Sequence, residues 1–220
     1  MKVSLIIPTL NEEEAIVKVL KDVPPVVNEV IIVDSSNDDT SKLAQSFGVE
    51  IVHEERLGYG RALQTGIEKA SGDIIVYMDG DCTYNPKEIS CIVQPIIEGT
   101  YDVVLGSRLK GKMLHGSMNR LNKIGNLVLS LVFNALFFKR ISDTQTGFRA
   151  VKRPLLNGLS YRDYGMSYAT EQLVQLVKMN IRISEVPITY HPRIGKTKLH
   201  PLPDGFKILK VILREKFTLR

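Results

Sequence analysis

Short apolar runs that are typical of β-strands alternate with segments of helical periodicity through the first hundred residues, and this alternation permits few folds. A strand, a helix and a second strand in that order predict a right-handed crossover between parallel strands. Strands this apolar are covered on both faces, so we expect an α/β fold with helices on either side of a mostly parallel sheet. The strand-like runs lie at 3–7, 29–33, 49–52, 73–78 and 101–105, and the helical segments at 12–21, 40–47, 61–70 and 86–97.

The pattern changes after Gly106. The 220 residues fit one compact domain. We therefore expect a single domain over residues 1–220, in which 1–106 and 107–220 have different roles. The second part has a long apolar segment at 124–138, a turn-rich stretch at 142–153, a helical segment at 168–179, a strand at 182–190 and a final helix.

The net charge of +5 hides a sharp division along the chain. Residues 1–104 contain 8 basic and 18 acidic residues, whereas residues 105–220 contain 21 basic and 6 acidic ones. An acidic half suits a metal ion, and a basic half suits phosphate groups or an anionic membrane. Nucleic acid is the weaker prediction, because the basic residues alternate with aliphatic ones and the chain has no tryptophan. We therefore expect no nucleic-acid partner.

Targeting and redox signals are weak in this sequence. Cys82 and Cys91 are too few for a disulfide framework and lack the CxxC spacing of a zinc site. The apolar run after Met1 is too short, and too soon followed by acidic residues, to be a signal peptide. The segment at 124–138 is shorter than the roughly 20 residues that a spanning helix needs. These features predict a cytoplasmic protein without a transmembrane helix.

Polar clusters follow three of the strand-like runs, and strands of a parallel sheet present their carboxyl ends at one edge. Pro8 and Thr9 follow the first run, Asp34 follows the second, and Asp79-Gly80-Asp81 follows the fourth. The two carboxylates of the last cluster offer the oxygen ligands that Mg²⁺ or Mn²⁺ prefers. The alternative is a turn with solvated acids, because Asp and Gly are common in turns.

Two segments at the same edge each have a structural and a functional interpretation. Asp34 would accept hydrogen bonds from a nucleobase or a ribose, whereas the residues after it cap the next helix. The glycines in Leu57-Gly58-Tyr59-Gly60-Arg61 would let the backbone approach a ligand before a helix. Alone, the same segment is typical of a turn.

The order and spacing of these motifs carry a family resemblance. In the first half they are Pro8-Thr9-Leu10-Asn11-Glu12, Val33-Asp34-Ser35-Ser36, Gly58-Tyr59-Gly60-Arg61, Met78-Asp79-Gly80-Asp81 and Gly106-Ser107-Arg108. In the second half they are Ser142-Asp143-Thr144-Gln145-Thr146-Gly147-Phe148-Arg149, Glu185-Val186-Pro187-Ile188 and Arg193-Ile194-Gly195-Lys196-Thr197-Lys198-Leu199. The set resembles the inverting, GT-A type glycosyltransferases of family 2, and its second part looks like the dolichol-phosphate mannose or glucose synthase branch. The resemblance implies a GT-A-like sheet with a nucleotide-binding half and an acceptor-binding half.

The resemblance also implies a nucleotide-sugar donor, of the GDP-mannose or UDP-glucose type, and a divalent metal, Mg²⁺ or Mn²⁺. It places Asp79 and Asp81 on the metal, with Asp81 beneath the diphosphate. Thr83 stands where mannose synthases often have a metal-binding Gln, which weakens a specific expectation of GDP-mannose. The residues expected to hold the nucleotide sugar are Pro8, Thr9, Glu12, Asp34, Gly58, Arg61, Asp79 and Gly80.

The implied acceptor is polyprenyl or dolichyl phosphate, which is already anionic and needs no strong general base. Arg108, Arg193 and Lys198 are expected to clamp the acceptor phosphate, with Thr197 providing a hydroxyl where Ser is commoner. Asp143 would orient Arg108 or the acceptor, or would cap the following turn. The expected catalytic residues are therefore Asp81, Arg108 and Asp143.

Two helices of the second half suggest contact with a membrane surface. In the segment at 124–138 and just before it, polar residues recur every four positions and the rest is apolar, which fits core packing, lipid or a second subunit. The final helix is basic and amphipathic, as suits the cytoplasmic membrane surface. We expect a peripheral membrane enzyme, either a homo-oligomer or a partner of a separate membrane subunit. The polar residues are Asn122, Asn126, Ser130 and Asn134.

Two other functions stay open at this level. One is transfer of sugar to a soluble acceptor or a glycan. The other is a non-catalytic adaptor that binds nucleotide sugars at a membrane, which the presence of both Asp79 and Asp81 disfavours.

Overall fold

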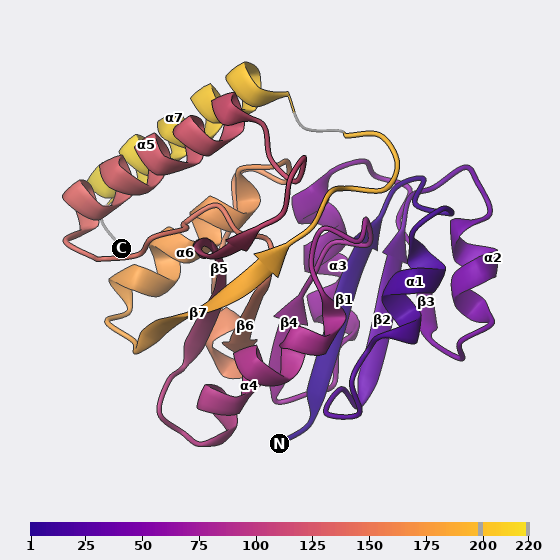
Figure 1. Ribbon diagram of the computed structural model, residues 1–220. Coiled ribbons are helices and arrows are strands. Elements are labelled where there is room, and N and C mark those ends of the chain that lie inside the picture. Colours follow the sequence, from indigo (N-terminus) through magenta and orange to yellow (C-terminus); the bar gives the residue numbers. More distant parts are fainter. Residues whose placement is uncertain (198–199, 219–220) are drawn as a thin grey trace.

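The structure is a computed structural model that describes residues 1–197 and 200–218, and in them seven strands form one mixed sheet (Figure 1). The strands lie side by side in the order β3-β2-β1-β4-β6-β5-β7. Four of the neighbouring pairs are parallel, as the sequence predicts, and the two pairs that involve β6 are antiparallel. The bounds are β1 Val3–Thr9, β2 Glu29–Asp34, β3 Glu50–His53, β4 Ile74–Tyr77, β5 Val103–Met113, β6 Arg149–Lys152 and β7 Ile183–Tyr190.

Helices lie on both sides of the sheet and bury its two faces (Figure 1). Successive residues of β1 alternate between two cores: Ile6 packs toward one side, and Leu5 and Ile7 pack toward the other. The mostly parallel three-layer arrangement expected from the sequence is confirmed. The first side has α3 (Tyr59–Lys69), α5 (Arg120–Phe137), α6 (Tyr168–Lys178) and α7 (Pro201–Phe217), and the second has α1 (Ile16–Lys21), α2 (Thr40–Gln45) and α4 (Ile89–Ile97).

The chain reverses its direction of progress across the sheet at β1. From β1 it continues through α1 to β2 and β3, and then α3 returns it to β4 on the other side of β1. Ligands of open α/β sheets bind at the carboxyl ends of strands next to such a switch point. The fold therefore directs attention to the ends of β1, β2 and β4.

One strand falls within a stretch for which only turns were predicted. β6 has four residues inside the turn-rich segment 142–153 and runs antiparallel between β4 and β5. The strand has only four residues, and two of them, Ala150 and Val151, are apolar and buried. Flanking Gly147 and Pro154 are turn signals that conceal so short a run.

The polar stripe of α5 faces the protein, not the solvent. Ser130 Oγ lies 3.0 Å from Thr144 Oγ1, and the Asn134 amide bonds both the N–H and the C=O of Ile141 at 3.0 and 2.8 Å. The outer face is apolar: Leu131 is 70% exposed and Phe138, just after the helix, is 87% exposed. Water therefore meets the hydrophobic side of this helix, which is the reverse of ordinary surface amphipathicity.

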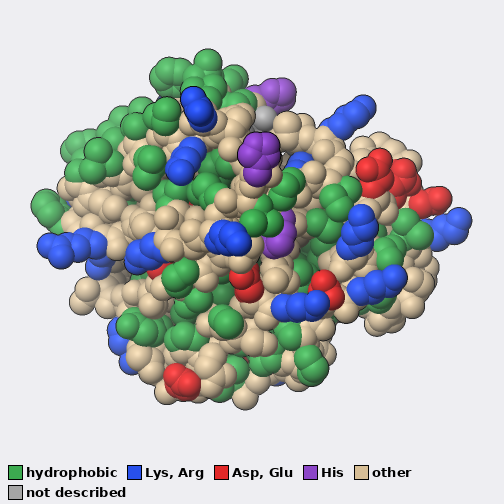
Figure 2. Space-filling model, viewed as in Figure 1, with side chains coloured by type: hydrophobic (Ala, Val, Ile, Leu, Met, Phe, Trp, Pro, Cys, Tyr) green, Lys and Arg blue, Asp and Glu red, His purple; other side chains and the backbone are tan. Residues whose placement is uncertain are grey.

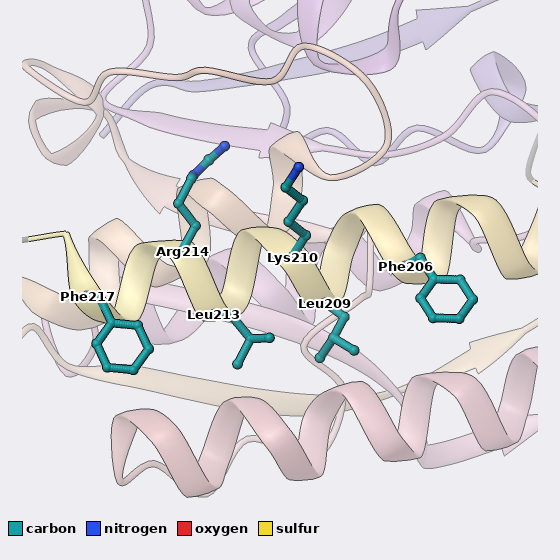
Figure 3. A pocket seen from close by; sticks show the side chains of 6 residues that line it. All are labelled: Phe206, Leu209, Lys210, Leu213, Arg214 and Phe217. Atoms are coloured by element: carbon teal, nitrogen blue, oxygen red, sulfur yellow. The ribbon is translucent and has the colours of Figure 1, made fainter.

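α7 lies beside α5 (Figure 1). Its apolar side chains lie on two sides of the helix, one buried and one exposed. Ile208 and Ile212 are buried in the core, whereas Phe206 and Phe217 are 71% and 80% exposed. Figure 3 shows the exposed row along one side of the helix, with Lys210 on the opposite side. Within the described residues, no helix has both the length and the apolarity to cross a membrane.

Candidate active site

The carboxyl ends of three parallel strands bring together the polar residues that the sequence singled out. Thr9 ends β1, Asp34 ends β2, and Asp79 and Asp81 follow β4. Thr9 pairs with Asp34 in the β1–β2 register, and its hydroxyl donates to Asp34 Oδ1 at 2.6 Å. The predicted convergence at one edge is therefore present in the fold.

Asp34 is buried and receives hydrogen bonds from hydroxyl groups of its own chain. Besides Thr9, the hydroxyls of Ser36 and Ser41 donate to it, at 2.5 Å each. These bonds fix the carboxylate at the strand end and compensate its charge by hydroxyl dipoles. Its predicted contact with a nucleoside remains a prediction.

Asp79 is the acid whose surroundings disfavour its charge most clearly. Burial of the carboxylate, followed by the charge of Asp81, raises the pKa of Asp79 well above its usual range, although the Tyr59 hydroxyl donates to it. Among the described residues, no hydrogen-bond donor reaches Asp79 Oδ1. Gly147 packs close to this carboxylate: a Cβ there would lie 3.3 Å from both Asp79 oxygens and 2.9 Å from the Tyr59 hydroxyl, so a residue with a side chain would crowd them. A divalent cation would relieve the repulsion between the two acids.

Asp81 is held at both of its oxygens. Thr83 donates its backbone N–H and its hydroxyl to Asp81 Oδ1 at 3.0 and 2.6 Å. On the other side Arg193 Nη1 donates to Asp81 Oδ2 at 2.5 Å, while its Nη2 pairs with Glu12. Thr83 therefore orients Asp81, and Arg193 joins two acids of the first half from the segment after β7.

Arg108 and Asp143 form a buried bidentate ion pair. Arg108 Nε and Nη2 donate to the two Asp143 oxygens at 2.7 and 2.8 Å, and the Arg108 backbone N–H adds a third bond at 3.1 Å. Burial opposes the charge of Arg108, yet the neighbouring carboxylate raises the pKa of the guanidinium well above its usual value. Of the alternatives for Asp143, orientation of Arg108 is what the geometry provides.

A second acid braces the loop that carries this pair. Glu185 of β7 accepts from the backbone N–H groups of Ser142 and Asp143 and pairs with Lys110 at 2.7 Å. Burial alone would raise the pKa of Glu185, but Lys110 and Ser142 lower it below its usual value. The bracing fixes Asp143 and, through it, Arg108.

The two glycines of the Gly58-Tyr59-Gly60-Arg61 motif face protein atoms. Gly58 has a φ of 145°, and a Cβ there would lie 2.7 Å from the Tyr164 carbonyl oxygen. A Cβ at Gly60 would lie 2.4 Å from Tyr168 Cβ. Arg61 stacks on the Tyr164 ring, with its Cζ 3.5 Å from the ring centroid. In this geometry the motif packs α3 against the loop before α6 and against α6 itself.

Sequence reasoning missed two residues near the strand ends. The sequence marks Tyr59 only as part of a glycine turn, although its hydroxyl bonds Asp79. Glu54 directly follows β3 and accepts from Arg56 and Thr65, so it is the strand-end acid of the third parallel strand. The rule that found Asp34 and Asp79 would also have found Glu54, because His53 ends a strand as well.

The remaining predicted residues are placed as follows. Pro8 lies in β1 beside Thr9. Gly80 packs against Thr9, since a Cβ on Gly80 would lie 3.1 Å from Thr9 Cγ2. Thr197 is exposed on the segment that follows Arg193, and Lys198 lies outside the described residues. Among the residues that the structure describes, no group of three or more acids, histidines or cysteines could hold a metal by itself. Asp79 and Asp81 would therefore need ligands from substrate or water.

Comparisons with known proteins identify the family and the fold of the chain. The sequence model of the family described as "Glycosyl transferase family 2" matches residues 4–159. A low-salt glycan biosynthesis hexosyltransferase of Haloferax volcanii is 34% identical over 217 residues, which are 96% of this chain and 52% of the relative. The chain thus spans about half the length of that protein. A dolichyl-phosphate hexose transferase of the same organism is 34% identical over 224 residues, 98% of this chain and 96% of the relative.

A solved structure shares the whole fold. It is glucosyl-3-phosphoglycerate synthase from Mycobacterium tuberculosis, crystallised with Mn²⁺, UDP and glucosyl-3-phosphoglycerate. The TM-score is 0.79 at 23% identity, over 100% of this chain and 81% of the synthase, and at this identity the likeness establishes the fold. The family match covers most of the chain and includes the ends of β1, β2 and β4. The chain belongs to glycosyl transferase family 2.

Proposed function

We propose that this glycosyltransferase moves a hexose from a nucleotide sugar to dolichyl or another polyprenyl phosphate, with inversion at the anomeric carbon. The observation that carries the proposal is the contact of Arg193 with Asp81 and Glu12, in a site where the charge of Arg108 also acts on Asp79. Paired acids suit a cation beneath a diphosphate, and arginines suit a second phosphate. The relative that is a dolichyl-phosphate hexose transferase, which this chain matches almost end to end, supports the acceptor class.

On the donor side, Asp79 and Asp81 would hold Mg²⁺ or Mn²⁺, which when bound neutralises the charge on the leaving nucleoside diphosphate. The Asp79 oxygen that no donor reaches among the described residues, and the two hydrogen bonds from Thr83 that orient Asp81, fit this assignment. Asp34, fixed by hydroxyl groups at the next strand end, would accept hydrogen bonds from the nucleoside. The base is not fixed by these contacts, so GDP and UDP sugars are both candidates.

On the acceptor side, a phosphate oxygen attacks the anomeric carbon while the bond from that carbon to the diphosphate breaks. The nucleophile is already an anion, so the site must position it and need not deprotonate it. Arg108 would bind the phosphate through N–H groups that Asp143 does not use, and Asp143 is the positioning residue that fixes its guanidinium. Thr197 and Lys198 would complete the clamp.

We also propose that the outer faces of α5 and α7 dock on an anionic membrane surface. Residues 114–142 include no acidic residue, and the two acids of α7, Asp204 and Glu215, are buried. Hydrophobic side chains gather over these helices in Figure 2. The exposed charges on the same helices and the turn after α5 are all basic, namely Arg120, Lys123, Arg140, Lys207 and Lys210. Apolar insertion with a basic surround is the chemistry of peripheral binding to anionic lipid, and it would bring the site to its lipid acceptor.

The test is a matrix of donors and acceptors. Purified full-length protein is incubated with labelled GDP-mannose, UDP-glucose or UDP-N-acetylglucosamine, with or without dolichyl phosphate in vesicles, and lipid and aqueous products are identified. We expect label in the lipid phase for one donor, only when dolichyl phosphate is present. Label that enters only a soluble acceptor would overturn the acceptor assignment, and no transfer with any donor would favour a non-catalytic role.

A further inference from the structure

Arg193 belongs to the basic half of the sequence, yet its guanidinium lies on two acids of the donor side. Its Nη1 donates to Asp81 Oδ2 at 2.5 Å, and its Nη2 pairs with Glu12. The side chain of Arg193 is about one quarter exposed, and those of the two acids are almost fully buried. A largely desolvated guanidinium between two carboxylates is a strong interaction, so it decides where this side chain rests.

Of these two carboxylates, that of Asp81 is also a proposed ligand of the metal. Asp81 Oδ1 already accepts two bonds from Thr83, so Oδ2 is the oxygen most open to a cation, and Arg193 Nη1 donates to it. A divalent ion on Oδ2 would compete for the same lone pairs and would lie against a like charge. Metal on Asp81 and Arg193 on Asp81 therefore exclude each other.

The backbone on either side of Arg193 is hydrogen-bonded to the segment from Asp81 to Thr83, and these bonds do not involve the Arg193 side chain. His191 N donates to the Thr83 carbonyl at 2.8 Å, and Ile194 N donates to the Asp81 carbonyl at 3.0 Å. Rotation of the long Arg193 side chain is therefore enough to free the guanidinium, without displacement of the segment. A freed guanidinium would remain tethered beside Asp81 by these backbone bonds, where the acceptor phosphate is the next anion to arrive.

We propose that Arg193 occupies the metal position as a placeholder cation, and that loading of the metal with the donor displaces it and delivers it to the acceptor phosphate. The inference rests on the proposed function for the identity of that phosphate. It makes the acceptor site depend on the donor site through one side chain. Arg193 is thus a binding residue whose availability is set by occupation of Asp81.

Binding of Mn²⁺ alone, followed by electron paramagnetic resonance on the full chain, tests the competition without turnover. The Arg193→Gln variant should bind Mn²⁺ about tenfold more tightly than the unmodified protein, because its competitor is gone. Arg182→Gln is the matched control, since Arg182 pairs with Asp102 at the other end of β7 and should leave Mn²⁺ affinity unchanged. Equal or weaker Mn²⁺ binding by Arg193→Gln, or no binding by either protein, overturns the proposal.

Delivery to the acceptor is tested by binding of the protein to vesicles that contain dolichyl phosphate. Mn²⁺ should strengthen this binding in the unmodified protein and not in Arg193→Gln, whereas an ion that simply bridges protein and phosphate would strengthen both and overturn the proposal. Circular dichroism establishes that the variant is folded. The proposed function fails separately: no sugar transfer to dolichyl phosphate, together with the Mn²⁺ difference, would refute the acceptor and leave the competition at Asp81 standing.

Discussion

Asp34 and Asp79 in the first half of the molecule and Arg108 and Lys110 in the second are held in opposite ways. In the first half, Asp34 is surrounded by hydroxyl groups and Asp79 has an oxygen that no donor reaches among the described residues. In the second half, Arg108 and Lys110 are each paired with a buried acid of that same half. Acids that hydroxyl groups hold, or that keep an oxygen without a donor among the described residues, are suited to receive a ligand, whereas basic side chains paired with buried acids are suited to hold a fixed position.

The difference teaches that the division of charge along the sequence is not a division of tasks in space. The segment after β7 carries Arg193 from the basic half into the acids of the first half. We predicted donor binding in one half and acceptor binding in the other, and this contact joins the two. Substitutions of charged residues in the two halves should therefore differ in the size and the kind of their effects.

The largest effect is expected at Asp81. Asp81→Asn keeps the shape and the acceptor oxygen for Thr83 but removes the charge that would bind metal, so turnover should fall by about 10³-fold or more, ~4 kcal/mol in the transition state. Steady-state assays of transfer check this, and EDTA should stop the unmodified enzyme. Asp39→Asn is the control, because Asp39 is an exposed acid of the same half. Undiminished activity of Asp81→Asn in the assay would remove the metal role.

The second largest effect is expected on the free energy of unfolding, at the Arg108–Asp143 pair of the second half. Asp143→Ala leaves Arg108 buried without its carboxylate and should lower the free energy of unfolding by about 3–5 kcal/mol, measured by urea denaturation. Arg182→Ala breaks a pair at the surface and should cost at most about 1 kcal/mol.

A double variant separates the structural role of the Arg108–Asp143 pair from its proposed role in binding the acceptor phosphate. Arg108→Met with Asp143→Leu replaces the ions by apolar groups and should recover most of the lost stability, while transfer activity stays low. Recovery of activity along with stability would mean that the pair has a structural role only.

Prediction from the sequence succeeded where the local signal and the fold agree. The strands that precede Thr9, Asp34 and Asp79 are apolar and regularly spaced, so the sequence alone places their ends at one edge of the sheet. The helix predicted at 12–21 begins only at Ile16, because the residues before it form a turn. Contacts between distant segments, such as Arg193 with Asp81, have no local signal.

The outer helices show the same limit in another form. The spacing of polar residues in α5 was correctly recognised, yet it could not show which side of the helix faces the protein. Asn134 and Ser130 point inward because they satisfy polar groups at 141–144. The sequence alone suggests removal of residues 203–220 as a test of membrane binding. That truncation would also remove Ile208 and Ile212 from the buried core, so it would change stability as well as membrane binding.

The third effect is therefore tested with point substitutions on the exposed row of α7. Phe206→Ser with Phe217→Ser should weaken binding to anionic vesicles by about 100-fold or more, since each inserted phenylalanine contributes about 1.5–3 kcal/mol at full burial and about 1.4 kcal/mol is a factor of ten. Both side chains are mostly exposed, so the unfolding temperature should hardly move. Added salt should weaken the binding of the unmodified protein. Unchanged vesicle binding together with loss of a dimer in sedimentation would assign this face to a second copy of the chain.

The smallest effect concerns an acid of the first half that does have a cationic partner. Hydrogen bonds from Arg56, opposed by burial and assisted by Thr65, lower the pKa of Glu54 from 4.5 to about 2. A lowered pKa means that the charged form favours the folded state, so its contribution is complete above about pH 4.5 and disappears as the pH falls toward 2. Glu54→Gln should therefore flatten the loss of unfolding free energy between pH 4.5 and 2, measured by urea denaturation at several pH values. Glu55→Gln, at the exposed neighbour, should leave that slope as it is. Equal slopes for Glu54→Gln and the unmodified protein would place the acid sensitivity elsewhere, with Glu29 as the next group to test, because against the effect of burial the hydrogen bonds from Ser4 and Ser71 lower its pKa to about 2 as well.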